Sequence, residues 1–182
     1  TLVEMAKRLG EIPKFSVPTP NGKKIAVIGG GPAGLGAASA FGQLGYAVDI
    51  FESRATLGGM MNLIPDQRPD KNVVQSDIEF LLSLGAIRAK TGTKVEDPKK
   101  LLAQEYDAVV VTTGLWKPIE LGIENENLAI RMVDLLGHPA DFSFSGRVVI
   151  IGGGATALDC ALTARQRGAR HVELIMLEKF SE

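Results

Sequence analysis

The chain has 182 residues, of which 45% are hydrophobic and 23% charged, and its formal net charge is −1. These fractions match an ordinary soluble globular protein, and the near-neutral charge argues against partners such as nucleic acid or an anionic membrane. A single cysteine, Cys160, excludes an internal disulfide and a Cys-x-x-Cys redox pair, and two histidines exclude a multi-histidine metal cluster.

The sequence shows neither a membrane span nor an export signal, and we expect a cytoplasmic piece of a longer protein. No apolar run reaches the roughly eighteen residues that a membrane span needs, and the first residues lack the pattern of a signal peptide. The chain begins with Thr1 rather than methionine, so we expect it to be processed or, as the preferred interpretation, cut from a longer chain. Residues 1–22 combine a short helical pattern with three prolines and predict a linker.

The predicted elements begin with a strand–helix–strand unit. Residues 25–28 form an apolar run typical of a buried parallel strand, and a glycine-rich loop follows them. Residues 35–44 are rich in alanine and predict a helix that ends near Gly45, and residues 47–51 predict a second strand. The elements expected further along are a helix over 73–84, short strands within 86–95 around Gly92, a helix over 97–105, a strand over 108–112, a mixed loop over 115–127, a helix over 128–136, a polar connection over 137–146, a strand over 148–151, a helix to about 166 and a strand over 172–177.

The first glycine loop has the pattern Gly29-x-Gly31-x-x-Gly34 between a predicted strand and a predicted helix. Gly29 permits a tight turn, Gly31 lets a pyrophosphate approach the helix N-terminus, and Gly34 lets the helix pack closely on the strand. Glu52 ends the next strand, where a carboxylate accepts hydrogen bonds from both hydroxyls of a ribose. The pattern predicts a dinucleotide site. The alternative is that the glycines only pack a helix on a sheet.

Two further segments rich in small residues follow. Gly58-Gly59 is by itself more typical of a turn, but after Glu52 it extends the expected phosphate contact from a second segment. Thr113-Gly114 ends the strand over 108–112 and allows another close backbone approach, although on its own it is a core strand and its turn.

The glycine loop is repeated as Gly152-x-Gly154-x-x-Ala157, in which alanine is a permitted variant in the third place. The acid expected after the next strand is Glu178. Two such loops predict two dinucleotides, and a flavin with a nicotinamide is the economical pair, because one carries a hydride and the other accepts it. Ten of the 21 glycines lie in these segments, which favours close backbone approach over a loose chain.

Together these segments resemble the two-dinucleotide flavoprotein fold of disulfide reductases. The closer resemblance is to the glutamate synthase small-subunit group, which includes the related halves of dihydropyrimidine dehydrogenase and of selenate reductase subunits. It covers roughly residues 20–178 and implies an α/β fold. The segments that carry it are 24–34, 51–52 with 58–59, 63–65, 81–85, 111–118, 121–123 and 152–159.

The resemblance implies two incomplete Rossmann-like domains after the linker. Residues 23–118 are expected to form the FAD-binding domain with a parallel sheet, without its closing segment, and residues 119–182 the first βαβ unit of an NAD(P)-binding domain. In this group the segment that closes the FAD domain follows the nicotinamide domain, which is why a fragment is expected.

The resemblance also assigns cofactor-binding residues, and it assigns neither a catalytic residue nor a metal ligand. Those expected at FAD are Gly29, Gly31 and Gly34 at the pyrophosphate, Glu52 at the ribose, Arg54, Gly58 and Gly59 along the cofactor, Val95 by the adenine, Thr113 and Gly114 near the phosphates, and Pro65 toward the flavin ring, with Pro32, Ala33 and Ser53 also expected to contact the cofactor. Those expected at NAD(P)H are Gly152, Gly154, Ala155, Thr156, Ala157 and Glu178.

The implied activity passes a hydride from NAD(P)H to FAD and electrons on to iron–sulfur clusters of a neighbouring domain or subunit. With one cysteine, this chain does not supply those clusters. Leu177 and Glu178 stand where the group has a basic pair suited to NADP, which favours NAD, and Ala155 replaces a frequent asparagine. Two alternatives stay open: a dinucleotide-binding or assembly module without turnover, and a disulfide reductase, against which the missing cysteine pair counts.

Overall fold

The computed structural model describes residues 2–177 except 12–14, 17 and 69. The chain divides into two compact units. Unit 1 consists of residues 1–61 and 69–114, and unit 2 consists of residues 62–68 and 115–182. The predicted domain limits of 22/23 and 118/119 stay predictions, and Glu178 lies outside the described residues.

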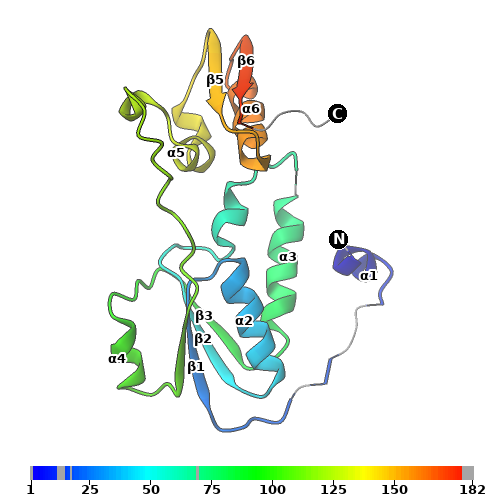
Figure 1. Ribbon diagram of the computed structural model, residues 1–182. Helices are drawn as coiled ribbons and strands as arrows, with labels where there is room; N and C mark the ends of the chain where they lie inside the picture. Colours follow the sequence, from blue (N-terminus) through cyan, green and yellow to red (C-terminus); the bar gives the residue numbers. More distant parts are fainter. Residues whose placement is uncertain (1, 12–14, 17, 69, 178–182) are drawn as a thin grey trace. The chain divides into compact units, whose positions relative to one another are not determined.

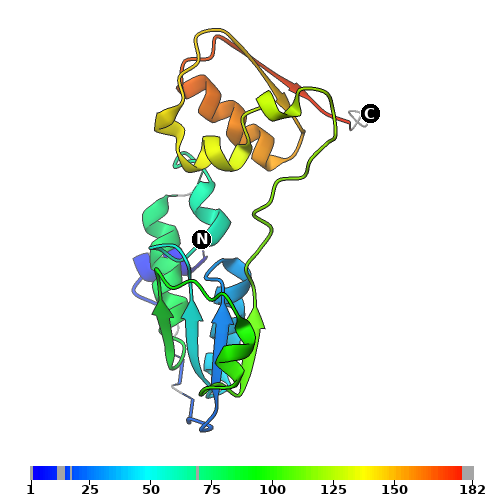
Figure 2. The same ribbon diagram turned by 90° about the vertical axis from the view of Figure 1, so that its left-hand side faces the viewer.

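Unit 1 contains a four-stranded sheet made of β1 (Lys24–Ile28), β2 (Ala47–Phe51), β3 (Ile87–Lys90) and β4 (Ala108–Val111). The strand order is β3-β2-β1-β4, and each neighbouring pair is parallel. Figure 2 shows the strands running in one direction. This arrangement confirms the predicted α/β class with a parallel sheet, in which the carboxyl ends of β1, β2 and β4 meet at one edge.

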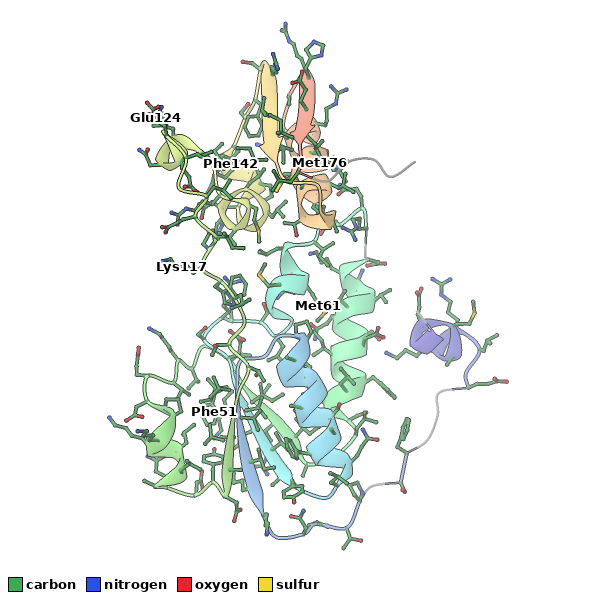
Figure 3. The ribbon with its side chains drawn as sticks, viewed as in Figure 1. Phe51, Met61, Lys117, Glu124, Phe142 and Met176 are labelled. Atoms are coloured by element: carbon green, nitrogen blue, oxygen red, sulfur yellow. The ribbon has the colours of Figure 1, made fainter. Side chains whose placement is uncertain are left out.

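Helices cover both faces of this sheet (Figure 1). On one face, α2 (Pro32–Gln43) and α3 (Lys71–Leu82) enclose an apolar core to which the strands contribute Val27, Val48 and Ile50. On the other face, α4 (Pro98–Leu102) packs over a second cluster that includes Phe51 and Tyr106. Figure 3 shows Phe51 among the side chains between the sheet and α4. Unit 1 also contains α1 (Leu2–Arg8), and the 3-10 turn η1 (Gly59–Leu63) crosses from unit 1 into unit 2.

Unit 2 contains a parallel pair of strands, β5 (Arg147–Ile151) and β6 (His171–Ile175), joined by α6 (Ala155–Gln166). These three elements form one βαβ unit, as predicted. Before them come the 3-10 turn η2 (Glu126–Leu128), the helix α5 (Met132–Gly137) and the 3-10 turn η3 (Pro139–Asp141).

Two element predictions are wrong. The segment around Gly92 has one strand, β3, rather than several, because Gly92 adopts φ +65° and the N–H groups of Gly92 and Thr93 turn back to the carbonyls of Arg54 and Glu52. The helix expected over 128–136 begins only at Met132, since Leu128 belongs to the separate turn η2.

A buried carboxylate that the sequence analysis overlooked joins β2 to β1, to β3 and to the residues just before β4. Asp49 on β2 is 3% exposed and accepts a hydrogen bond from the Tyr106 hydroxyl at 2.6 Å. The ammonium groups of Lys24 and Lys90 lie 3.1 and 3.0 Å from the same oxygen. Burial raises the pKa of Asp49, but the hydrogen bonds from Tyr106, Lys90 and Lys24 outweigh burial and hold that pKa below its ordinary value.

Candidate dinucleotide sites

The first glycine loop starts where β1 ends, and its first member is shaped by β4. The N–H of Gly29 donates to the carbonyl of Phe51 at 2.8 Å, and the residue has φ +108°. A β-carbon on Gly29 would lie 2.4 Å from the carbonyl oxygen of Thr112. Both its conformation and its neighbours therefore require glycine, as the tight-turn role predicts.

The third member, Gly34, is required by the packing of α2 on the loop. A β-carbon there would lie 1.8 Å from the carbonyl oxygen of Gly29 and 2.8 Å from the hydroxyl oxygen of Thr112. That hydroxyl donates to the carbonyls of Ile28 and Gly29, with an oxygen–oxygen distance of 3.0 Å in each case. The strand end, the loop and the helix are thus packed backbone to backbone.

The middle member, Gly31, has no such reason to be glycine. Its φ of −78° suits any residue, and the nearest atom to an added β-carbon is the Cα of Gly59 at 3.8 Å. Gly31 is the N-cap of α2, and no side chain in the described part of the chain caps that helix start. An open glycine beside helix N–H groups fits an anionic group that approaches from outside the polypeptide.

The glycine pair after β2 lies against this loop. Gly58 donates its N–H to the carbonyl of Gly30 at 2.8 Å and has φ +113°. A β-carbon on Gly59 would lie 2.9 Å from the Cα of Gly31. The structure therefore brings Gly59 and Gly31 together from two segments, and their contact with a phosphate stays a prediction.

Glu52 lies beside the same loop, but its carboxylate already has partners within the chain. The side chain is buried, with Glu52 7% exposed, and Oε2 accepts a hydrogen bond from the N–H of Gly30 at 2.8 Å. Oε1 accepts from the N–H of Arg54 at 2.9 Å and from the Ser53 hydroxyl at 3.2 Å. A carboxylate has about four acceptor positions, so capacity for a ribose hydroxyl remains. The ribose contact stays a prediction.

The other residues expected at FAD fall into three groups. Thr113 lies next to the loop, since its Cα would be 3.1 Å from a β-carbon on Gly29, and Gly114 follows it with φ +75°. Val95 packs against the cluster under α4. Pro65 belongs to unit 2, so its place toward a flavin ring stays a prediction.

The second glycine loop repeats the first with more space. Gly152 has φ +131° and donates its N–H to the carbonyl of Ile175 at 2.8 Å, as Gly29 does to Phe51. A β-carbon on Gly152 would lie 3.6 Å from the β-carbon of Ala157, an ordinary contact, so alanine fits the third place. Gly154 is the N-cap of α6, and a β-carbon there would meet no atom within 4 Å among the described residues.

The residues expected to contact the dinucleotide at the start of α6 differ in exposure, and the contact itself stays a prediction. Ala155 and Thr156 are exposed in the first turn of the helix, whereas Ala157 is buried. The carboxylate of Asp159, in the second turn, is buried and forms an ion pair with Arg68. The sequence analysis did not predict this ion pair, because Arg68 and Asp159 are distant along the chain.

The described residues offer little support for a metal site, a membrane span or a reactive thiol. They contain no group of three or more His, Cys, Asp or Glu side chains that could hold a metal ion, and none of their helices is long and apolar enough to cross a membrane. Cys160 is buried, and burial followed by the charge of Asp159 raises the pKa of its thiol to about 11. A thiol with that pKa is a packing residue rather than a nucleophile at neutral pH.

A family model described as pyridine nucleotide-disulphide oxidoreductase matches residues 23–180. The beta subunit of the NADP(+)-dependent formate dehydrogenase of Moorella thermoacetica is 38% identical over 85% of this chain and 23% of that protein. The glutamate synthase (NADPH) small chain of Escherichia coli is 32% identical over 93% of this chain and 40% of that protein. These relatives confirm the resemblance to the small-subunit group.

A solved structure shows the same fold. The thioredoxin reductase of Lactococcus lactis aligns with a TM-score of 0.58 and 21% identity, over 85% of this chain and 56% of that one. The chain therefore spans less than half of the two curated relatives and little more than half of this structural neighbour.

Proposed function

The chain belongs to the pyridine nucleotide-disulphide oxidoreductase family, and from that premise we propose that unit 1 binds FAD and that the glycine loop of unit 2 binds NAD(P)H. The protein passes a hydride from the nicotinamide to the flavin. One observation carries the proposal: position 31 is glycine, although neither its backbone conformation nor its neighbours require glycine there, and the space beside it is open. A ligand that comes close to the backbone accounts for it.

The residues of unit 1 fit FAD. The backbone of Gly31 and Gly59 leaves room for a pyrophosphate, and the N-terminus of α2 presents N–H groups and a partial positive charge to it. Glu52 supplies the acceptor for the adenosine ribose, beside the segment that contains Val95. FAD when bound supplies the hydride acceptor, and the chain's own residues bind and orient it.

The residues of unit 2 fit the nicotinamide cofactor in the same way. Gly154 leaves space at the start of α6, and Ala155 and Thr156 present the first-turn N–H groups. The carboxylate of Glu178 favours NAD, because it would repel a 2′-phosphate. The names of both curated relatives specify the phosphorylated cofactor, so turnover with NADH against NADPH decides this preference.

We place the electron acceptor on another part of the protein or on another subunit. Both curated relatives are named as parts of larger enzymes, a beta subunit and a small chain. An iron–sulfur domain is the proposed acceptor, and its cysteines lie outside these 182 residues, which contain one cysteine. A cytoplasmic location is proposed with it.

The test uses the protein that carries this chain and compares Gly31, the N-cap of α2, with Gly36 inside the same helix. Gly31→Ala and Gly36→Ala both place a β-carbon where no atom lies closer than 3.8 Å. We expect Gly36→Ala to keep the visible flavin absorption. We expect Gly31→Ala to weaken FAD binding by about tenfold, equivalent to about 1.4 kcal/mol, with unchanged folding.

Three results bear on this proposal. Equal flavin content in Gly31→Ala and Gly36→Ala would remove the argument from the open glycine. A wild-type protein that stays colourless after reconstitution with FAD would contradict the function itself. Flavin that binds but is not reduced by NADH or NADPH would favour a dinucleotide-binding module without turnover.

A further inference from the structure

A short segment of the chain leaves unit 1 and packs in unit 2. Residues up to 61 belong to unit 1, residues 62–68 belong to unit 2, and unit 1 resumes at residue 69. Within unit 2, Leu63 is 8% exposed, and a β-carbon on Gly137 of α5 would lie 3.7 Å from its Cδ2. The segment is therefore anchored at its start by an apolar side chain.

The other end of the segment is anchored by an ion pair with α6. Nη1 of Arg68 lies 2.8 Å from Oδ1 and 2.9 Å from Oδ2 of Asp159, so one donor atom is shared between both carboxylate oxygens. The N–H of Arg68 donates to the carbonyl of Pro65 at 2.9 Å, which closes the turn that presents the guanidinium. The side chain of Asp159 is 7% exposed and that of Arg68 is 49% exposed.

The position of Asp159 on α6 gives this ion pair a functional consequence. Asp159 lies one helical turn after Ala155, and the helix starts at the open residue Gly154. A charge-assisted contact to a nearly buried carboxylate opposes rotation and translation of that turn. The contact therefore restrains α6 one turn after its start.

We propose that Arg68 is a positioning residue for the nicotinamide cofactor, acting through Asp159. The proposal rests on the proposed function, since it assumes that α6 receives the dinucleotide. Arg68 holds the start of α6 in its binding orientation before the dinucleotide arrives. Without Arg68, the carboxylate of Asp159 is buried without its counter-charge, and the helix start must be ordered at the moment of binding.

The same unit offers a matched control. Arg147 and Glu173 form an ion pair at 2.6 Å between β5 and β6, and their side chains are 64% and 50% exposed. Exposed pairs of this kind contribute little to stability. Arg147→Ala therefore removes one arginine and one ion pair from unit 2 without touching α6.

The first experiment needs no cofactor. Amide hydrogen exchange is measured in wild type, Arg68→Ala, Asp159→Asn and Arg147→Ala. We expect Arg68→Ala and Asp159→Asn to raise exchange at the first amides of α6 and in residues 62–68 by about tenfold. Arg147→Ala leaves these amides unchanged. Wild-type exchange at the start of α6 in Arg68→Ala would overturn the proposal.

The second experiment uses the flavin-loaded protein and titrates NADH and NADPH. We expect Arg68→Ala to raise KM for the preferred dinucleotide by about tenfold, with an unchanged kcat and an unchanged FAD content. Arg68→Lys keeps the charge and recovers part of the loss, which a purely steric role would not produce. An unchanged KM, or a loss confined to kcat, would contradict positioning.

The failure of the proposed function would look different. In that case wild type itself would hold no FAD or would not bind a nicotinamide dinucleotide, whatever residue stands at 68. The exchange experiment would then still decide whether Arg68 orders the start of α6.

Discussion

Each of the two glycine loops joins a strand to a helix, but the helix packs more closely on the strand end in unit 1 than in unit 2. In unit 1 the helix lies so close to the strand end that a β-carbon on Gly34 would come within 1.8 Å of a backbone oxygen. In unit 2 the corresponding residue is Ala157, and even a β-carbon added on Gly152 would lie 3.6 Å from the β-carbon of Ala157, an ordinary contact. The difference teaches that the residue in the third place of the pattern depends on how closely the helix packs on the strand, whereas the middle glycine is explained by the proposed ligand.

The strands beside the two loops also differ, since those of unit 1 are more deeply buried than those of unit 2. Val27, Val48 and Ile50 of unit 1 are each at most 1% exposed, because helices cover both faces of four strands. In unit 2, Ile151 and Ile175 on the two strands are each 57% exposed. Packing therefore constrains the first loop far more than the second.

The largest effect is expected for Gly34→Ala. The new β-carbon overlaps the carbonyl oxygen of Gly29, and backbone cannot yield as a flexible side chain does. We expect a loss of about 3 kcal/mol in the free energy of unfolding. The matched change Ala157→Gly in unit 2 costs about 1 kcal/mol, through helix propensity. Denaturant unfolding of both variants checks this, and equal losses would break the comparison.

A smaller loss is expected for Asp49→Asn. The charge holds Lys24 and Lys90 in unit 1, and since those ammonium groups are partly exposed we expect a loss of about 2 kcal/mol at neutral pH. The pKa of Asp49 is lowered in the folded state, so its contribution is complete above the ordinary value of 3.8 and disappears as the pH falls through the folded value. Unfolding measured against pH should therefore show wild type and variant converging in acid, and a constant difference would contradict this.

A change in binding rather than stability is expected for Gly154→Ala. Its β-carbon meets no described atom, so the free energy of unfolding should stay near that of wild type. The affinity for the nicotinamide dinucleotide should fall by about tenfold, since the added methyl group occupies the place of the pyrophosphate. FAD content serves as the control. An unchanged affinity for the dinucleotide would mean that the middle glycine of the second loop does not contact the ligand as the middle glycine of the first is proposed to do.

The smallest effect is expected for Arg147→Ala, which removes the exposed ion pair with Glu173. We expect a loss of at most about 0.5 kcal/mol, and less at high salt. Thermal unfolding at two salt concentrations measures it. A loss comparable to that of Asp49→Asn would mean that the β5–β6 sheet is less open than its exposed side chains indicate.

Local patterns predicted the fold well where each element carries its own signal. The apolar runs of β1 and β2 and the glycines between them led directly to the strand–loop–helix arrangement. The strand predicted after Gly92 failed because a left-handed glycine turns the backbone toward Glu52. The start of α5 was misplaced because the apolar Leu128 precedes the helix in a separate turn.

What no local pattern revealed are the contacts between distant segments. Asp49 draws its partners from β1, from β3 and from Tyr106, which lies two residues before β4, so nothing near it in the sequence marks it as the centre of a charge cluster. Arg68 and Asp159 are 91 positions apart in the sequence. Folding is needed to bring such charges together.

The bond between Glu52 and the N–H of Gly30 has a consequence for how fast and how tightly unit 1 takes its ligand. Because the carboxylate holds the loop from within the chain, the loop is ordered without a ligand, and a cofactor bound as proposed would not have to shape it. The entropy of ordering those residues is then lost during folding rather than during association. Such pre-organisation favours a site in which recognition requires almost no rearrangement of the polypeptide, and the cofactor meets a surface already in place.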